Sequence, residues 1–228
     1  MKKIILLLLL ATTNLIVAQN ITFEQVGLKV ENGKAGFVFD LLNDFYGSIK
    51  KPEGVNISLS RVYFKPEEVE ATHFLTFSGS VEGLIALRKL RSGAEYLAFN
   101  DNILKFADLV SVTGGSTLMR MNVDKASENV FQVWKWRVED APSFAAAFTD
   151  LIKAFPQQGY LSLGQFSHGT SSNGESHYVY TTHKDYGAAL AWGPKTQAQQ
   201  QAFIKFQKLT NKYSDYLGSM TMVRLKSW

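Results

Sequence analysis

Cysteine is absent from the 228 residues of this chain. Its absence excludes disulfide bonds, thiolate nucleophiles, iron–sulfur clusters, cysteine-based zinc sites and covalently attached c-type haem. It also excludes a bacterial lipoprotein, which needs a cysteine to carry the lipid anchor. We therefore expect the fold to be stabilised by packing and hydrogen bonds alone.

Charge of one sign is also scarce. The formal net charge is +4, from 24 basic and 20 acidic residues, and two of the basic residues, Lys2 and Lys3, lie in the N-terminal leader. Without the leader, the excess of basic over acidic residues falls to two, and no run of Lys or Arg exceeds two residues. Proteins that bind nucleic acids carry a concentrated basic surface, so this sequence predicts no nucleic-acid partner.

Motifs of the common enzyme classes are missing as well. The chain has no P-loop, no G-x-G-x-x-G fingerprint, no G-x-S-x-G elbow and no Ser-His-Asp signature, so no catalytic residue is predicted. His168, His177 and His183 lack the helical spacing of a metal site, and the last two are roughly 20 Å apart on an extended segment. The sequence therefore predicts no metal site.

A long apolar run occurs at the N-terminus. Residues 1–18 are predicted to be a signal peptide, because Lys2 and Lys3 precede the apolar run Ile4–Ala11 and Ala18 stands just before a cleavage point. The run is shorter than the ~20 residues that a membrane-spanning helix needs. We therefore expect a soluble protein in the periplasm or outside the cell, without membrane contact once the leader is removed.

The main positive feature is a tandem repeat. A shift of 104 residues aligns 73–120 with 177–224 without a gap, which pairs His73 with His177 and Arg120 with Arg224. A second match joins 23–32 to 131–140. The repeat predicts a first unit at 19–122, a linker at 123–129 and a second unit at 130–228. Units of this size are marginal alone, so we expect them to pack together.

Both units have the same predicted order of elements. Alternating apolar and polar residues predict strands, and apolar residues at helical spacing predict helices. In the first unit, the expected strands are 22–30, 55–64, 73–77 and 117–121, and the expected helices are 35–46, 80–90 and 92–107. Ser80 and Ser92 are expected to cap the last two helices, and Gly114 and Gly115 are expected to form a turn. In the second unit, the expected strands are 131–138, 160–166, 177–182 and 220–225, with helices beginning near Pro142, Asp185 and Gln197. Asp185 is expected to cap the second of these helices.

The order β-α-β-β-α-β is the ferredoxin-like arrangement of the α+β class, in which helices cover one face of an antiparallel sheet. Two copies bury their bare faces by packing them together. The element order, the split second helix of each unit, and Arg120 and Arg224 in the closing strands resemble the dimeric α+β barrel superfamily in a fused, tandem form. The resemblance covers residues 22–228. It implies two antiparallel sheets that face each other as an intramolecular pseudo-dimer.

This superfamily includes monooxygenases of the antibiotic-biosynthesis type, haem-binding and haem-degrading proteins and stress-responsive proteins. The resemblance implies architecture and does not by itself imply chemistry, because one fold serves many functions. Haem is the one cofactor that it suggests, and the residues themselves indicate none.

Two repeated histidines, His73 and His177, are the sharpest candidates for a ligand site. Imidazole binds metals and haem iron and transfers protons near neutral pH. The alternative is that each histidine secures the start of a strand through a hydrogen bond. Because His73 shares the parity of Leu75 and Phe77, the sheet face that it uses stays open.

Four repeated cations are the other candidates. Lys29 aligns with Arg137, and Arg120 aligns with Arg224. The first and last strands of a ferredoxin-like unit are neighbours, so each unit is expected to place two cations on its inner face. Buried cations need partners. Either an acidic ligand meets them or carboxylates do, with Glu24, Glu31 and Glu139 as examples.

Aromatic residues are concentrated in the second unit, at Trp134, Trp136, Trp192, Tyr178 and Tyr180. They suit either an aromatic-lined cavity for a planar ligand or ordinary core packing.

Three functions follow from the sequence. The first is binding of a small acidic or aromatic ligand between the two sheets, without catalysis. The second is a cofactor-independent monooxygenase or a haem-handling enzyme, which requires a histidine pointing into the cavity. The third is a structural or protein-interaction module whose barrel is filled with side chains.

Overall fold

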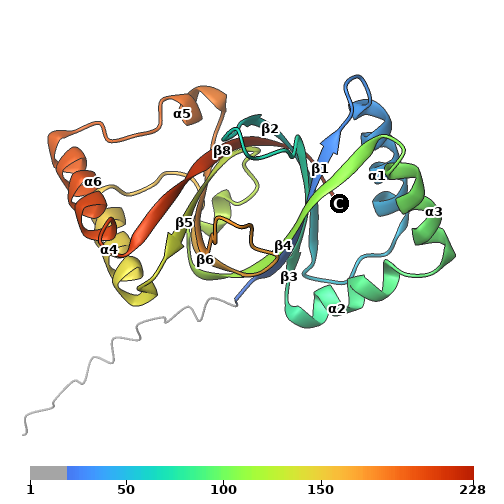
Figure 1. Cartoon of the computed structure of the whole chain (residues 1–228), viewed down its shortest axis with the longest axis horizontal. Coiled ribbons are helices and arrows are strands. Elements are labelled where there is room, and N and C mark those ends of the chain that lie inside the picture. Colours follow the sequence, from blue (N-terminus) through green and yellow to red (C-terminus); the bar gives the residue numbers. More distant parts are fainter. Residues whose placement is uncertain (1–19) are drawn as a thin grey trace, which may run out of the picture.

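The computed structural model describes residues 20–228 (Figure 1). The predicted signal peptide, residues 1–18, lies outside this range. Figure 1 shows a central barrel of strands with helices on two opposite sides. Within the described range, no helix is both long enough and apolar enough to cross a bilayer.

The observed elements follow the predicted order twice. In the first unit, the strands are β1 (Thr22–Val30), β2 (Asn56–Phe64), β3 (His73–Gly79) and β4 (Ala107–Met121), and the helices are α1 (Ala35–Ser48), α2 (Val81–Leu90) and α3 (Ala94–Ile103). In the second unit, the strands are β5 (Val130–Val138), β6 (Leu161–His168), β7 (His177–His183) and β8 (Ser214–Ser227), and the helices are α4 (Ala141–Ala154), α5 (Tyr186–Leu190) and α6 (Gln197–Thr210). A short 3₁₀ helix, η1 (Val123–Lys125), lies between the units.

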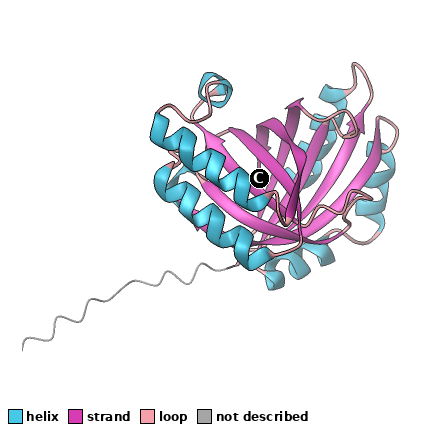
Figure 2. Ribbon diagram, turned by 60° about the vertical axis from the view of Figure 1, so that its left-hand side comes forward, coloured by secondary structure: helices cyan, strands magenta, loops and turns pink. Residues whose placement is uncertain are grey.

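The eight strands form one closed antiparallel barrel in the order β1-β3-β2-β8-β5-β7-β6-β4. The two halves of the barrel meet where β2 pairs with β8 and where β4 pairs with β6. Closure gives every strand of the described chain a neighbour on both sides. Figure 2 shows the helices packed on the outside of this barrel. The α+β class and the two ferredoxin-like units with facing sheets are therefore confirmed.

The closing strands are longer than predicted. β4 begins at Ala107 instead of Thr117, and β8 begins at Ser214 instead of Met220. Each pairs first with the first strand of its own unit and then with a strand of the other unit. The turn predicted at Gly114 and Gly115 is wrong, because both glycines lie inside β4 where it passes from one half of the barrel to the other.

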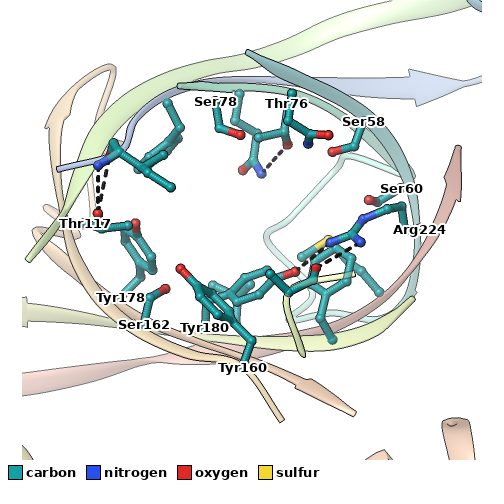
Figure 3. Close-up of a pocket in the computed structure, with 18 of the residues that line it drawn as sticks. Ser58, Ser60, Thr76, Ser78, Thr117, Tyr160, Ser162, Tyr178, Tyr180 and Arg224 are labelled. Carbon is teal, nitrogen blue, oxygen red and sulfur yellow. Dashed lines mark hydrogen bonds between the residues drawn. The ribbon is translucent and has the colours of Figure 1, made fainter. Parts of the chain in front are cut away.

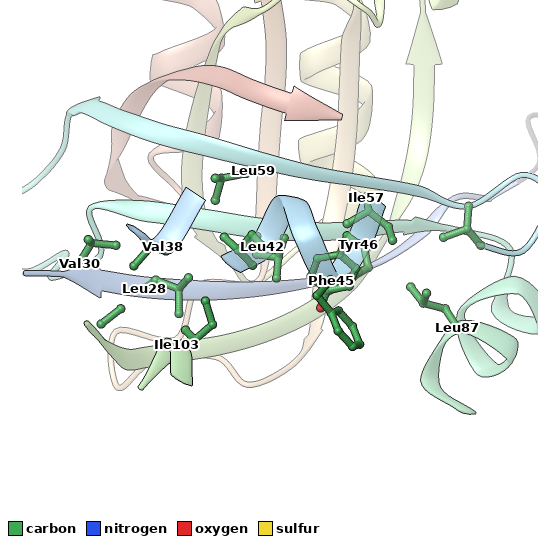
Figure 4. Packing of buried hydrophobic residues seen from close by; sticks show 14 of the residues in the cluster. Leu28, Val30, Val38, Leu42, Phe45, Tyr46, Ile57, Leu59, Leu87 and Ile103 are labelled. Carbon is green, nitrogen blue, oxygen red and sulfur yellow. The ribbon is translucent and has the colours of Figure 1, made fainter. Parts of the chain in front are cut away.

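The outer face of the barrel carries the apolar cores. Figure 4 shows the core of the first unit, in which side chains of α1, α2 and α3 meet the outward side chains of the strands. Its buried members include Leu28, Ile57, Leu59, Leu75 and Phe77 from the sheet, with Val38, Leu42, Leu84, Leu87 and Ile103 from the helices. Full burial of each such side chain contributes about 1.5–3 kcal/mol. In the second unit, α4 and α6 cover Leu161, Leu163 and Val179 in the same way.

Helix caps agree in part with the sequence. The Ser80 hydroxyl accepts a hydrogen bond from the Gly83 amide at 3.0 Å, and Asp185 accepts from the Ala188 amide at 2.7 Å, as predicted for these two N-caps. The cap predicted at Ser92 is wrong. Gly93 holds that position with φ +88°, and the Ser92 hydroxyl donates to the Lys89 carbonyl instead.

The C-terminus of the second unit completes the core of the first. The Trp228 ring packs against that core, 5.7 Å from the Tyr46 ring, and its amide donates to the Ile57 carbonyl at 3.0 Å. Met119 of β4 packs in turn against the core of the second unit. The two halves of the barrel therefore depend on each other for complete cores.

Candidate functional site

The barrel encloses a cavity of about 520 Å³ between the two sheets. This volume lies within the about 300–1,000 Å³ of typical small-molecule sites. All eight strands contribute lining residues, and Figure 3 shows ten of these labelled around the open centre. The barrel interior is thus not filled by side chains, unlike the interior that the third function requires.

The two walls of this cavity differ in chemistry. The wall from the first unit is rich in hydroxyls and amides, at Gln25, Ser58, Ser60, Thr76 and Ser78. The wall from the second unit is aromatic, at Phe131, Tyr160, Phe166, Tyr178 and Tyr180. In Figure 3, Ser58, Thr76 and Ser78 lie across the cavity from Tyr160, Tyr178 and Tyr180, and Ser162 lies among the tyrosines. A ligand between them meets hydrogen-bonding groups on one face and rings on the other.

Strand alternation produces these walls. In β7, His177 and Val179 point to the helices. Tyr178 and Tyr180 alternate with them along the strand, so their side chains point into the barrel. The glycine of β6, Gly164, makes room for one of these rings. A Cβ on Gly164 would lie 2.3 Å from the Tyr178 hydroxyl oxygen.

The cavity tyrosines are neutral hydrogen-bonding groups. Burial raises the pKa of Tyr178 well above its usual range and that of Tyr180 to about 12, although the charge of Arg224 acts on Tyr180 in the opposite direction. Burial also raises the pKa of Tyr160. None of the three phenols is therefore a base near neutral pH, and all three offer a hydroxyl.

Arg224 is the predicted cation that does line the cavity. Its guanidinium donates to the Ala126 carbonyl at 3.2 Å and to the Tyr180 hydroxyl at 3.3 Å. The third nitrogen, Nε, is buried and has no hydrogen-bond acceptor within residues 20–228. The guanidinium carbon lies 6.0 Å from the centre of the Phe131 ring.

A second cavity cation, Lys135, was missed by the sequence analysis. Its ammonium lies 5.2 Å from the centre of the Phe166 ring. Burial lowers the pKa of Lys135, and the negative charge of Glu175 opposes this shift. The signal was present, because Lys135 stands between Trp134 and Trp136, which pack against the helices, so alternation turns it inward.

Lys29 and Arg137 do not line the cavity, contrary to expectation. Lys29 is half exposed and donates to Glu70 at 2.8 Å. Arg137 is also half exposed and pairs with Asp215 at 2.5 Å. Both side chains point away from the helices, as strand alternation predicts. They do not reach the cavity, because carboxylates near the ends of the strands bind them. These partners differ from the glutamates suggested by sequence.

Arg120 and Arg224 are not equivalent in the structure. Phe23 pairs with Gly115 in β4, and its counterpart Phe131 pairs with Met222 in β8. Gly115 and Met222 therefore occupy equivalent positions in the two closing strands. Two residues after them stand Thr117 and Arg224, so Thr117 is the structural counterpart of Arg224, and it also lines the cavity. Arg120 lies opposite Ser162 and outside the cavity lining, close enough for its charge to lower the pKa of Tyr160.

The two repeated histidines face the helix layers and not the cavity. His73 and His177 are both buried, and each Nδ1 lies 3.0 Å from the hydroxyl of the preceding residue, Thr72 or Ser176. Those hydroxyls accept the amide hydrogens of Val30 and Val138 in the first strands. The geometry matches the alternative reading, in which the histidines help to secure the start of a strand.

We expect His73 to make stability depend on pH. Burial, and secondarily the charge of Arg61, lowers the pKa of His73 to about 4 from its usual 6.5. The unfolded state therefore binds more protons than the folded state between these values, so stability falls as the pH is lowered from 6.5 to about 4. This effect of His73 lowers the free energy of unfolding by about 2 kcal/mol at pH 4.5, compared with pH 8.

The measurement is urea unfolding of the wild type and His73→Asn at pH 8, 6.5, 5.5 and 4.5, since asparagine keeps a group near the Thr72 hydroxyl. At pH 8 the imidazole is neutral in both the folded and the unfolded state, so the difference in unfolding free energy between wild type and variant reports packing alone. A shallower pH dependence in the variant is expected. Parallel curves would contradict the assignment.

The tryptophans of the second unit form a separate, smaller cavity. Trp134, Trp136 and Trp192 line a space of about 250 Å³ between the sheet and helices α4 and α6. The Trp192 indole donates to Gln157 at 2.7 Å. The aromatic residues grouped together by sequence are thus divided, with the tyrosines in the barrel and the tryptophans under the helices.

Among the described residues, neither cavity is lined by a histidine that could bind a haem iron. Within residues 20–228, no group of three or more histidine, aspartate or glutamate side chains is arranged to hold a metal ion. The residues therefore do not fit a histidine-ligated haem. Tyrosine and methionine, which also ligate haem iron in some proteins, do line the barrel cavity at Tyr160, Tyr178, Tyr180, Met220 and Met222.

Comparisons with known proteins identify the fold. No protein-family model matches the sequence, and no curated protein matches it. Among solved structures, a "putative monooxygenase" from Lactobacillus acidophilus NCFM has a TM-score of 0.60 and 17% identity, over 91% of this chain and 95% of that one.

Two further structures are similar over their length. An anthrone oxidase-like protein has a TM-score of 0.59 and 11% identity, over 92% of this chain and 93% of that one. A variant chlorite dismutase from Candidatus Nitrospira defluvii has a TM-score of 0.52 and 8% identity, over 90% and 92%. The chain thus has the dimeric α+β barrel fold of these proteins, and identities this low do not transfer their activities.

Proposed function

We propose that this protein binds a small ligand, acidic or aromatic, in the cavity between its two sheets and does not transform it. The observation that carries the proposal is the 520 Å³ cavity with a hydroxyl wall opposite an aromatic wall. Mostly apolar linings with a few fixed polar groups are typical of small-molecule sites.

An enzyme of the monooxygenase kind is the alternative. The shared fold with proteins described as monooxygenases and chlorite dismutases is consistent with it. A proton-abstracting reaction needs a base near the substrate. Within residues 20–228, no histidine lines the barrel cavity, and its tyrosines have raised pKa values. Lys135, whose pKa burial lowers, is the basic group nearest to this role, and its ammonium lies against the Phe166 ring. Binding without catalysis is therefore the better-supported function, and an oxygen-consumption assay with the bound ligand separates the two.

The N-terminal sequence bears on the cellular location of the protein. We propose export to the periplasm or the exterior, because residues 1–18 have the sequence of a signal peptide. Fractionation of the source cells with N-terminal sequencing of the protein tests this. A protein that keeps Met1 in the cytoplasm would contradict it.

Filling the cavity is the direct test of ligand binding. Ser78 is half-buried and lines the hydroxyl wall, so a phenylalanine there extends into open space. We expect Ser78→Phe to weaken binding of 2-naphthoate, measured by isothermal titration calorimetry, by about tenfold or more, since the ring takes the ligand's volume.

The matched control is Gln201→Phe, which adds the same ring to an exposed position of α6. It should bind 2-naphthoate like the wild type. Equal weakening in both variants would argue against the barrel cavity, as would unchanged binding in Ser78→Phe with a native circular dichroism spectrum.

A further inference from the structure

We propose that the cavity ligand is an aromatic compound with an anionic group at one end, and that Arg224 binds this group. The inference rests on the proposed function and extends it. It states that the ligand is both acidic and aromatic, and it states how the ligand is oriented in the barrel, with its anionic group at Arg224.

The first argument is the unused capacity of Arg224. Two other arginines of the described chain have carboxylate partners, Glu24 for Arg91 and Asp215 for Arg137. Within residues 20–228, Arg224 has no ion pair, and its two hydrogen bonds go to neutral oxygens. Arg224 is half-buried and lines the cavity, so an anionic group beside it gains charge-assisted hydrogen bonds that the neutral oxygens do not supply.

The nearby acidic residue is already engaged. The Glu128 carboxylate accepts a hydrogen bond from the Thr182 hydroxyl at 2.6 Å, and among residues 20–228 it forms no ion pair with Arg224. The buried Nε of Arg224 is a donor with no acceptor among the described residues. A carboxylate takes two parallel hydrogen bonds from one guanidinium, so it is the chemical match for these donors.

Two hydroxyls flank the same position. Ser60 lies opposite Arg224 in the pairing of β2 with β8, and both line the cavity. The Tyr180 hydroxyl lies 3.3 Å from the guanidinium. Figure 3 shows Ser60 and Arg224 at one end of the cavity and Tyr180 on the adjoining wall, with its hydroxyl directed at Arg224. One cation and two hydroxyls form a compact anion site.

Aromatic rings continue from this anion site along the wall of the second unit. Phe131 stacks on Tyr180 with ring centres 4.9 Å apart, and Tyr180 contacts Tyr160 edge-on at 5.8 Å. The guanidinium lies over the Phe131 ring at 6.0 Å. A ligand anchored on Arg224 thus places a planar body against these rings.

Lys135 is the other cation of the cavity and supplies the control. Lys135 pairs with Gly218 of β8, and Arg224 lies six residues further along the same strand. At the rise of a β-strand, the backbones of the two cations are therefore about 20 Å apart along the sheet. The charge of Glu175 acts on Lys135, and the Phe166 ring covers its ammonium. Neither Lys135 nor Arg224 has an ion pair among residues 20–228, so the two cations differ in their position along the cavity, and Lys135 tests where the anion binds.

The experiment compares two probes of nearly equal shape, 2-naphthoate and 2-naphthamide, by titration calorimetry. The wild type should bind the acid about tenfold more tightly than the amide, since hydrogen bonds to charged groups are worth that much or more. Arg224→Gln should remove this preference while the amide affinity stays within about twofold. Lys135→Gln should keep the preference.

Each other outcome has a defined meaning. Equal binding of both probes to the wild type, or a preference that survives in Arg224→Gln, would overturn the anion site and leave the proposed function standing. A preference lost in Lys135→Gln instead would place the anion at the other end of the cavity and overturn the assignment to Arg224. Binding of neither probe would reject the proposed function as well. If Arg224→Gln fails to fold, Arg224→Lys, which keeps the charge without the fork, should show an intermediate preference.

Discussion

Replacement of Gly115 by alanine is expected to lower the free energy of unfolding by about 3 kcal/mol or more. A Cβ at this position would lie 2.0 Å from the Gln165 carbonyl oxygen and 2.9 Å from the Phe23 ring. The clash is with backbone, so β4 and β6 must separate at the seam that closes the barrel. The measurement is urea unfolding followed by tryptophan fluorescence.

The control is Gly47→Ala in α1, where a Cβ meets no atom of the described residues within 4 Å. That change should be neutral or stabilise the protein by up to about 1 kcal/mol, because alanine favours a helix. If Gly115→Ala were as stable as Gly47→Ala, the close pairing of β4 with β6, and with it the closed barrel, would be in doubt.

Phe144→Ala is expected to cost about 3–5 kcal/mol. The Phe144 ring is 0% exposed and contacts the rings of Trp136 at 5.5 Å, Phe206 at 5.7 Å and His177 at 6.0 Å. Its loss leaves a hole between α4 and the sheet. Because burial lowers the pKa of His177, water in that hole should also raise this pKa toward its usual value.

Urea unfolding gives the loss of stability, and NMR titration of the imidazole protons gives the pKa of His177. The matched control is Phe37→Ala on α1, where the ring is 56% exposed, and it should cost less than about 1 kcal/mol. An unchanged pKa in folded Phe144→Ala would show that His177 does not depend on this helix layer.

Local patterns were sufficient for the fold class. Strand alternation in β1 sent Val26 and Leu28 toward the helices, and the same periodicity held in the second unit. The element order then fixed the sheet arrangement, because two bare sheet faces have few ways to be covered. The length of β4 and β8 was not predictable in this way, since their second halves are strands through pairing with the other unit.

The candidate site was predicted only in part, and the reason is register. Arg120 and Arg224 match in a gap-free alignment, but hydrogen bonding pairs their strands differently, so Thr117 takes the place equivalent to Arg224. A shift of register changes which side chains reach the interior. The offset arises before the closing strands, because α6 has 14 residues where α3 has 10, and a sequence match carries no information on such a difference.

Charge compensation was the other obstacle. Lys29 and Arg137 had the parity of interior residues, yet Glu70 and Asp215 bind them at 2.8 and 2.5 Å. Such partners come from distant parts of the chain and cannot be identified before the fold is known. Lys135 was accessible to the same parity argument between two tryptophans, and the repeat hid it because its counterpart in the first unit is Gly27.

The central claim is that a ligand occupies the barrel between the two sheets. The most direct measurement is a crystal structure of the protein without its leader, grown with 2-naphthoate. The account predicts density among Phe131, Tyr178 and Tyr180, with the carboxylate within about 3 Å of the Arg224 guanidinium. A barrel filled by its own side chains, or a ligand bound beside Trp192 under the helices instead, would contradict it.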